Sequence, residues 1–329
     1  MNVFVTGATG FIGSAVARGL VETGHTVVAL ARSNPAPAVP GVRFVPGDLA
    51  AADGLAAAEG ALREARIIVH LAALRKDWGL PESTVERVNV ESGVRLLERA
   101  PRLERLVFVS SVGVHGFAVG SPIDEASPMR PYDSYGAAKV AAEQRLVSAA
   151  AARRVPLVIT RPGIIYGPGD GYGMITNMIR MIGSHRFLLI GDGTNRVQIL
   201  YVDDLAAALR AAIERSEAEG QAFVLTGREE IRLRDLAARI AAALGTRLPP
   251  FHVPERAARL IASALERAGR LRGTKTEPFV THSKLNLMTR DYLCDTTKAR
   301  TLLGFHPAVA MPEGIDRTVA WLHGAARAG

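Results

Sequence analysis

Cysteine is nearly absent from the sequence: Cys294 is the single one among 329 residues. One thiol cannot form a disulfide within the chain, and a CxxC metal site is missing as well. A small secreted domain held together by disulfides is therefore excluded, and no metal site is expected. We expect a protein of a reducing compartment, the cytoplasm.

Long apolar runs and blocks of like charge are absent too. No uninterrupted apolar stretch reaches the roughly 18 residues of a membrane-spanning helix. The N-terminus enters a strand at Val3 without a charged leader, so no signal peptide is expected. The net charge of +8 favours an anionic partner. Much of it is arginine spread over alanine-rich helices, without a nucleic-acid-binding motif, so we expect no nucleic-acid partner.

Short apolar strands alternate with helical patterns, such as that of residues 134–152, through the first half of the chain. Repeated units of this kind predict the α/β class and a doubly wound parallel sheet covered by helices on both faces. The pattern loosens after about residue 166, which indicates a smaller, mixed α/β domain that covers the substrate. We place the sheet domain at residues 1–165, rejoined by about 195–225, and the substrate domain mainly at 166–194 and 226–329.

A glycine-rich turn, TGATGFIG, joins the first strand to the first helix. Its three glycines permit a tight turn and the close approach of a ligand. The start of the helix offers free N–H groups and a positive dipole end to a pyrophosphate. A dinucleotide-binding turn requires this strand–turn–helix context. The expected cofactor contacts here are Gly7, Thr9, Gly10, Phe11, Ile12 and Gly13.

The spacing G-x-x-G-x-x-G resembles that of the extended short-chain dehydrogenase/reductase superfamily, the NAD-dependent epimerase/dehydratase superfamily. The resemblance implies a Rossmann-type fold and an NAD(P) cofactor. It also implies that Asp48 and Leu49 lie at the adenine end, and that the segments HLAA and RPGI border the nicotinamide end. The contacts implied at the nicotinamide end are Leu71, Ala72, Ala73, Ser110, Pro162, Gly163 and Ile164.

The end of the second strand bears on the choice of cofactor. An acidic residue there would bind the ribose hydroxyls and repel a 2′-phosphate. This chain has Arg32 instead, and a guanidinium is suited to phosphate. NADP(H) is therefore favoured. NAD(H) remains the alternative, in which Arg32 only stacks on adenine or faces solvent.

The segment SYGAAK places Tyr135 and Lys139 four residues apart, on one face of a helix. A tyrosine with a pKa near 10 is a poor base at neutral pH. We expect the lysine ammonium to lower that pKa, so that the pair exchanges a proton with an alcohol/ketone couple. The resemblance implies that Ser111 orients the substrate oxygen. It also implies that Asn89 holds a water relay to the lysine.

The segment GDGTNRVQI bears on the substrate. Relatives that act on nucleotide sugars commonly have G-D-G-x-Q-x-R-D-F here, and the position of their diphosphate-binding arginine is Val197 in this chain. The segment, together with Trp78–Gly79, RPGIIYGPGD and the C-terminal stretch from Lys284 to Pro307, resembles the 3β-hydroxysteroid dehydrogenase and sterol dehydrogenase branch. The expected substrate contacts are Ser111, Tyr135, Trp78, Met174, Val197 and His115, which stands where the family usually has tyrosine.

These features predict an NAD(P)-dependent oxidoreductase that interconverts a secondary alcohol and a ketone on a steroid-like or ketolipid-like substrate. One alternative is a nucleotide-sugar 4-epimerase or dehydratase. A second is a non-catalytic module that senses NADP(H), against which the intact set Ser111, Tyr135 and Lys139 argues.

Two expectations concern larger partners. The helical pattern at 255–271 separates arginines from apolar residues, which makes it a candidate for weak contact with a membrane surface. A surface helix packed on its own domain is the favoured interpretation. A homodimer is expected by analogy with the superfamily.

Overall fold

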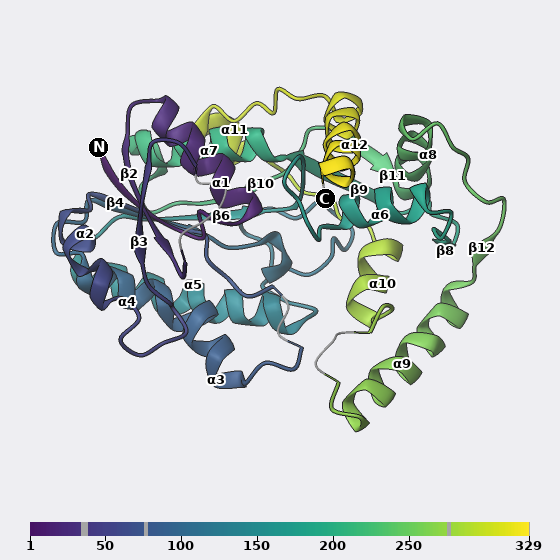
Figure 1. Cartoon of the computed structure of the whole chain (residues 1–329), viewed down its shortest axis with the longest axis horizontal. Helices are drawn as coiled ribbons and strands as arrows, with labels where there is room; N and C mark the ends of the chain where they lie inside the picture. The colour runs from purple at the N-terminus through teal and green to yellow at the C-terminus, as the bar shows by residue number, and fades with distance from the viewer. Residues whose placement is uncertain (34–38, 76–77, 275–277, 329) are drawn as a thin grey trace.

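The computed structural model describes residues 1–33, 39–75, 78–274 and 278–328 (Figure 1). The strands of its main sheet are β1 (Asn2–Thr6), β2 (Thr26–Ala31), β3 (Val42–Pro46), β4 (Ile67–His70), β5 (Arg105–Val109), β6 (Leu157–Pro162) and β10 (Ala222–Leu225). They are all parallel and lie in the order β10-β6-β5-β4-β1-β2-β3. The predicted doubly wound parallel sheet is confirmed.

Both faces of this sheet are covered by helices, because successive side chains of a strand point to opposite faces. In β1, Val3 and Val5 belong to one apolar cluster and Phe4 to another. Residues of α1 (Phe11–Glu22), α7 (Val202–Glu214) and α11 (Thr297–Leu303) complete the first cluster. The second is completed by α2 (Glu59–Glu64), α4 (Ser92–Arg99) and α5 (Ser134–Arg153). The double burial explains why the strands are almost continuously apolar.

The strand order reverses between β1 and β4, since β2 and β3 extend the sheet on one side of β1 and the later strands extend it on the other. In such sheets ligands bind in the crevice at the carboxyl ends of the strands, beside this reversal. The glycine turn follows β1, the segment HLAA begins at the end of β4, and the two serines follow β5. The fold therefore brings the three predicted motifs to one edge of the sheet.

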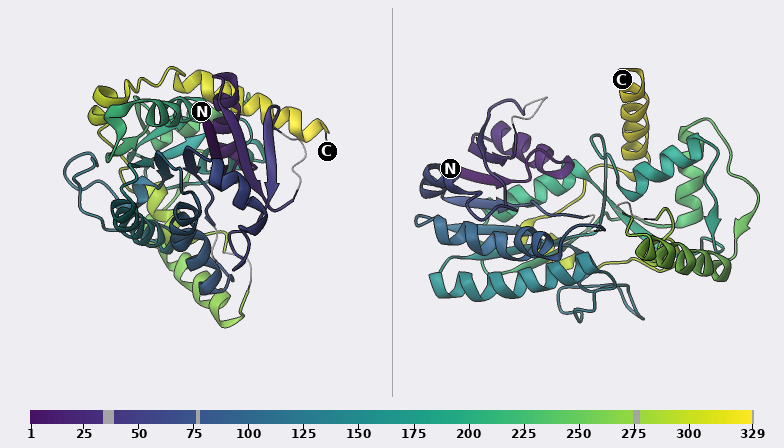
Figure 2. Two further views of the ribbon diagram at one scale, coloured as in Figure 1. Left: turned by 90° about the vertical axis from the view of Figure 1, so that its left-hand side faces the viewer. Right: turned by 60° about the horizontal axis from the view of Figure 1, so that its bottom comes forward.

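The smaller domain is built on a three-stranded sheet of β7 (Ile164–Tyr166), β9 (Arg196–Tyr201) and β11 (Glu230–Arg232), and on the pair β8 (Leu189–Ile190) and β12 (His252–Val253). Around it lie α6 (Met174–Gly183), α8 (Leu233–Ala243), α9 (Glu255–Leu271), α10 (His282–Thr289) and α12 (Met311–Ala328) (Figure 2). The elements do not follow the predicted division throughout. β9, within 195–225, belongs to the three-stranded sheet of the smaller domain, and β7 lies across the predicted boundary at residue 165. Conversely α11, within 226–329, packs against β10 of the main sheet. Among the described helices, none is both long and apolar enough to cross a membrane.

Candidate active site

At two of its glycines the turn packs so closely on other backbone atoms that there is no room for a side chain. Gly7 has φ +79° and accepts a hydrogen bond from the N–H of Gly10 at 3.0 Å. A Cβ on Gly13 would lie 2.0 Å from the carbonyl oxygen of Gly7, and one on Gly7 would lie 2.8 Å from the nitrogen of Ala72. These two glycines therefore permit the close packing of the turn, whereas Gly10 is exposed beside Thr9.

The start of α1 fits a pyrophosphate. Its first N–H groups have no partner within the helix, no side chain caps it, and its first turn contains no acidic residue. Phe11 and Ile12 in that turn are half-buried. An uncapped helix start with a positive dipole end is suited to hold an anion, so the residues present fit the phosphates of the expected cofactor.

The adenosine end of the expected site lies beside β2 and β3. Arg32 directly follows β2, is exposed, and makes no ion pair with any residue that the structure describes. Asp48 accepts a hydrogen bond from the N–H of Ala50 at 3.0 Å, next to the buried Leu49. Arg95 donates to the carbonyl oxygen of Leu49 at 2.8 Å, so the loop is held in place from the side of α4.

The tyrosine and the lysine are placed by α5. Asp133 caps this helix by accepting the N–H of Gly136 at 2.8 Å. Lys139 is buried, and its Nζ donates to the carbonyl oxygen of Val109 at 2.7 Å. The same Nζ lies 5.8 Å from the ring centroid of Tyr135. The predicted pair therefore meets at the end of β5.

Burial is the largest influence on the pKa values of Lys139 and Tyr135. It lowers the pKa of Lys139 to about 7, against the negative charge of Glu143, which raises it. It also raises the pKa of Tyr135, and the charge that opposes this rise is that of Arg75. The expected lowering of the tyrosine pKa by Lys139 is therefore not found here. Tyr135 is therefore protonated at neutral pH and can donate its proton to a carbonyl oxygen.

Arg75 was not anticipated from the sequence. It is exposed on the loop after β4. Burial raises the pKa of Tyr132 and of Tyr292, and the charge of Arg75 opposes that rise, as it does at Tyr135. It makes no ion pair with a described residue. The charge of Arg75 therefore acts on Tyr135. The position of Arg75 shortly after a strand end is the one signal in the sequence that could have pointed to it.

The two serines after β5 have different surroundings. The Oγ of Ser111 accepts the N–H of Gly113 at 3.1 Å, which leaves its hydroxyl hydrogen free to donate. The Oγ of Ser110 is buried and finds no hydrogen-bond partner among the described residues, and the same is true of Thr226 after β10. Buried hydroxyls are usually paired. Two unpaired hydroxyls just beyond the ends of β5 and β10 fit a polar ligand at this edge of the sheet. The expected nicotinamide would be such a ligand.

Asn89 lies in a π-helical segment, Glu86–Glu91, between α3 (Glu82–Val85) and α4. Such wider helical turns are often found at functional sites. The side-chain oxygen of Asn89 accepts the N–H of Leu74 at 2.7 Å, and its nitrogen donates to the carbonyl of Leu74 at 2.9 Å. Asn89 therefore anchors the loop that carries Arg75.

His70, at the end of β4, connects the same segment to the turn after β1. Its Nδ1 lies 2.7 Å from the Oγ1 of Thr6 and its Nε2 lies 2.8 Å from the Oγ of Ser92. Ser92 donates to the carbonyl of Val88, so Nε2 carries the proton and Nδ1 accepts. Thr6 in turn accepts the N–H of Ala72 at 3.2 Å. Burial lowers the pKa of His70 to about 3, which keeps the ring neutral.

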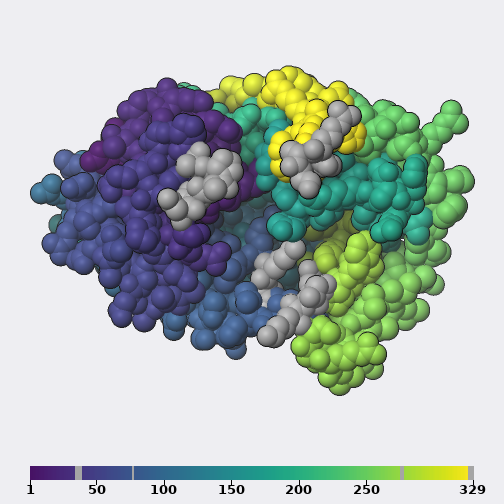
Figure 3. All heavy atoms as spheres, viewed as in Figure 1, coloured from purple at the N-terminus to yellow at the C-terminus, as the bar shows by residue number. Residues whose placement is uncertain are grey.

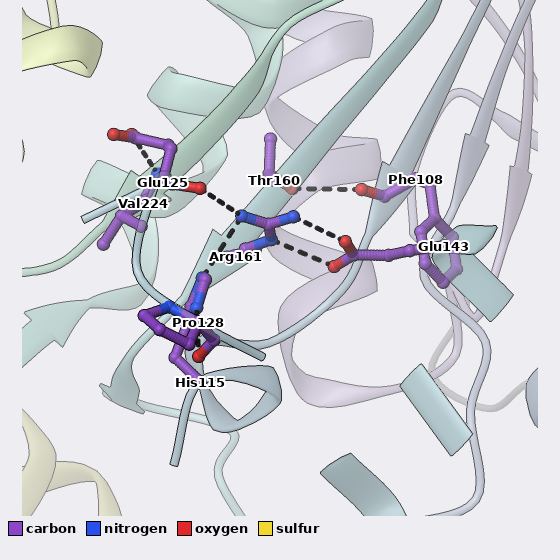
Figure 4. Close-up of polar contacts among 8 residues, drawn as sticks. All are labelled: Phe108, His115, Glu125, Pro128, Glu143, Thr160, Arg161 and Val224. Carbon is purple, nitrogen blue, oxygen red and sulfur yellow. Dashed lines mark hydrogen bonds and ion pairs between the residues drawn. The ribbon is translucent and has the colours of Figure 1, made fainter. Parts of the chain in front are cut away.

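A buried ion pair joins β6 to α5, the helix that carries Tyr135 and Lys139 (Figure 4). Arg161 contacts both carboxylate oxygens of Glu143, at 3.1 and 2.6 Å. It also donates to the Nε2 of His115 at 3.2 Å, while the Nδ1 of His115 faces the carbonyl of Pro128 at 3.4 Å. Both nitrogens of His115 are thus occupied and the residue is 5% exposed. This corrects its predicted place on the substrate wall, because His115 packs behind the site.

Val197 also differs from its prediction. It is 0% exposed and lies in the apolar cluster of the smaller domain, so it does not line an open surface. Its neighbour Arg196 is exposed and pairs with Glu230 at 3.1 Å and with Asp291 at 3.6 Å. The one arginine of β9 therefore lies on the face of the strand opposite Val197, where it pairs with two carboxylates.

The other predicted substrate and nicotinamide residues lie at the junction of the domains. The Nε1 of Trp78 donates to the carbonyl of Thr274 at 2.7 Å, which ties the loop after β4 to the end of α9. Met174 and Ile164 are half-buried against the cluster of the smaller domain. Leu71, Ala72, Ala73 and Gly163 are half-buried and Pro162 is buried.

Known proteins resemble the whole chain. Residues 3–226 match the NAD dependent epimerase/dehydratase family. A 2-alkyl-3-oxoalkanoate reductase of Stenotrophomonas maltophilia is 30% identical over 332 residues, 97% of this chain and 99% of that protein. A 3beta-hydroxysteroid-dehydrogenase/decarboxylase of Arabidopsis thaliana is 28% identical over 285 residues, 79% of this chain and 49% of that protein. A solved UDP-glucuronic acid 4-epimerase from Bacillus cereus with NAD shares the fold, with TM-score 0.79, 21% identity and 99% of both chains covered.

Proposed function

Because the chain belongs to the NAD dependent epimerase/dehydratase family and is an NAD(P)-dependent enzyme, we propose that it reduces the ketone of a hydrophobic, ketolipid-like or steroid-like substrate with NADPH. When bound, the reduced nicotinamide supplies the hydride. The proposal concerns the substrate class, the proton donor and the phosphate on the cofactor. Each rests on different residues of the chain.

The assignment of the proton donor rests on Tyr135. A phenol whose pKa is raised by burial holds its proton at neutral pH and donates it to the ketone oxygen. The free hydroxyl hydrogen of Ser111 orients that oxygen. Lys139 has a pKa of about 7, so its Nζ gains and loses a proton near neutrality and can restore the proton of the phenol.

The substrate class is carried by one observation, the arrangement of β9. Where relatives acting on nucleotide sugars have an arginine for the diphosphate, this chain has the buried Val197, and Arg196 is engaged by two carboxylates. A diphosphate would find no free cation on this strand. The 2-alkyl-3-oxoalkanoate reductase among its relatives is named for a keto substrate, in agreement with the proposal.

The preference for NADPH rests on Arg32. It follows β2, where an acid would repel a 2′-phosphate, and no described carboxylate pairs with it. An exposed guanidinium is free to donate two parallel hydrogen bonds to phosphate oxygens.

A coupled screen tests the function. Ketolipids, steroid ketones and UDP-sugars are each offered to the whole chain with NADPH and with NADH, and oxidation of the cofactor and isomerisation of the sugars are measured. We expect NADPH oxidation with at least one hydrophobic ketone and no change in the UDP-sugars. Sugar isomerisation without ketone reduction would establish the epimerase alternative. Tight NADPH binding without turnover of any compound would establish the sensing module.

A further inference from the structure

The helix α9 turns its large apolar side chains outward. Its buried positions are small, namely Ala258, Ala262 and Gly269. A helix of a globular protein normally buries its large apolar residues. Here four of them are exposed: Leu260 at 73%, Ile261 at 50%, Leu265 at 40% and Leu271 at 83%. The helix thus packs on its own domain through small residues, and this packing leaves the four large apolar side chains exposed.

Arginines border this apolar surface. At about 100° per residue, Arg256, Arg267 and Arg270 lie along one edge of the sector that contains Leu260 and Leu271. The three arginines are exposed and make no ion pair with a described residue.

The remaining charges of α9 are engaged on its inner side. Arg259 contacts Glu255 at 2.7 Å and also Asn286. Glu266 accepts the N–H of His282 at 2.7 Å. The outward surface is thus apolar and cationic together, while the two carboxylates of the helix are engaged by Arg259 and by the N–H of His282.

We propose that α9 docks on the surface of a membrane that contains anionic lipid. A helix with an apolar sector beside a cationic sector lies in the interface with its leucines among the acyl chains and its arginines at the headgroups. Anionic lipid complements both these arginines and the net charge of +8. Figure 3 shows α9 along the lower edge of the molecule, and the left view of Figure 2 shows it extending beyond the other elements.

The docking helix is connected to the catalytic helix by short contacts. Trp78, on the loop after β4, contacts the end of α9 through Thr274. Ser283 of α10, which packs on α9, donates at 3.2 Å to Asp133, the cap of the helix of Tyr135. Docking would therefore hold the catalytic face near the bilayer. The entry of a lipid-borne ketone at this face rests on the proposed function, whereas the docking of α9 does not.

Vesicle co-sedimentation of the whole chain tests the proposal without turnover. The vesicles are phosphatidylcholine alone, or phosphatidylcholine with 30% phosphatidylglycerol, each at low and high salt. We expect at least tenfold stronger partition to the anionic vesicles, weakened by salt. The variant Leu260→Ser/Ile261→Ser/Leu271→Ser should lose at least tenfold of it, and Arg256→Gln/Arg267→Gln/Arg270→Gln should remove the preference for anionic lipid.

Matched controls change similar exposed residues elsewhere. They are Val147→Ser/Met129→Ser for the apolar change and Arg18→Gln/Arg102→Gln/Arg186→Gln for the charge, and both should bind vesicles like the wild type. Thermal melting confirms that each variant folds. Equal binding of all variants, or no binding at all, overturns the proposal. If the leucine variant instead converts a dimer to a monomer, a second copy of the chain covers α9.

Discussion

Arg32 is the residue on which the proposed preference for NADPH depends. It stands alone at the end of β2, since no described carboxylate pairs with it. Changing Arg32 to Asp removes a phosphate ligand and adds a repelling charge. We expect the Kd of NADPH to rise at least tenfold and that of NADH to change little, as measured by calorimetric titration. Arg18→Asp on α1 is the control, and an equal loss of both cofactors in the Arg32 variant would contradict the assignment.

The neutral ring of His70 links stability to pH. Its pKa of about 3 in the folded protein lies below the ordinary 6.5 of the unfolded chain. Between these values the unfolded chain binds a proton that the folded protein does not. The contribution is therefore complete above about pH 6.5 and is lost as the pH falls towards 3, by roughly 1.4 kcal/mol per pH unit.

Replacement of His70 by Gln should flatten this part of the pH dependence. Urea unfolding of the wild type and of the variant is measured at intervals from pH 7.5 to pH 4. The free energy of unfolding of the wild type should fall more steeply than that of His70→Gln. Parallel curves would mean that His70 titrates alike in both states.

Most elements follow from local patterns, and the site follows from their order. Apolar runs predicted the buried strands, and the range predicted for the helix of Tyr135, 134–152, agrees with α5. What the sequence could not supply depends on distant partners. His115 and Arg161 are 46 positions apart, and only their contact shows that the histidine lies behind the site. The burial of Val197 and the outward apolar face of α9 likewise depend on which elements happen to pack against them.

The π-helical segment 86–91 sets the position of Asn89, and with it the loop after β4. Changing Asn89 to Ala removes two hydrogen bonds to the backbone of Leu74 and leaves buried groups unpaired. We expect a loss of about 2 kcal/mol in the free energy of unfolding, together with a lower kcat for ketone reduction. Ser148→Ala, exposed on α5, is the control. Unchanged stability and unchanged kcat would show that the loop does not depend on Asn89.

The assembled molecule has an open groove between α4 and α5, of about 730 Å³, on the side away from the smaller domain. Its lining residues include Arg95, Glu98, Arg145 and Ala149. A homodimer is expected by analogy with the superfamily, and we propose that the second copy covers this groove. Light scattering after gel filtration should give the mass of a dimer for the wild type and of a monomer for Ala149→Arg. Ala151→Arg, on the exposed side of the same helix, should stay dimeric, and a monomeric wild type would refute the arrangement.

The measurement that tests the central claim most directly is NADPH oxidation with a hydrophobic ketone, in the wild type and in Tyr135→Phe. The phenol lies next to Lys139 and keeps its proton at neutral pH, so it is the proton donor of the proposed reduction. General acid catalysis contributes about 10²- to 10⁴-fold. We predict a loss of kcat of that order in the variant, with NADPH binding retained. Equal kcat in the two proteins would contradict the account.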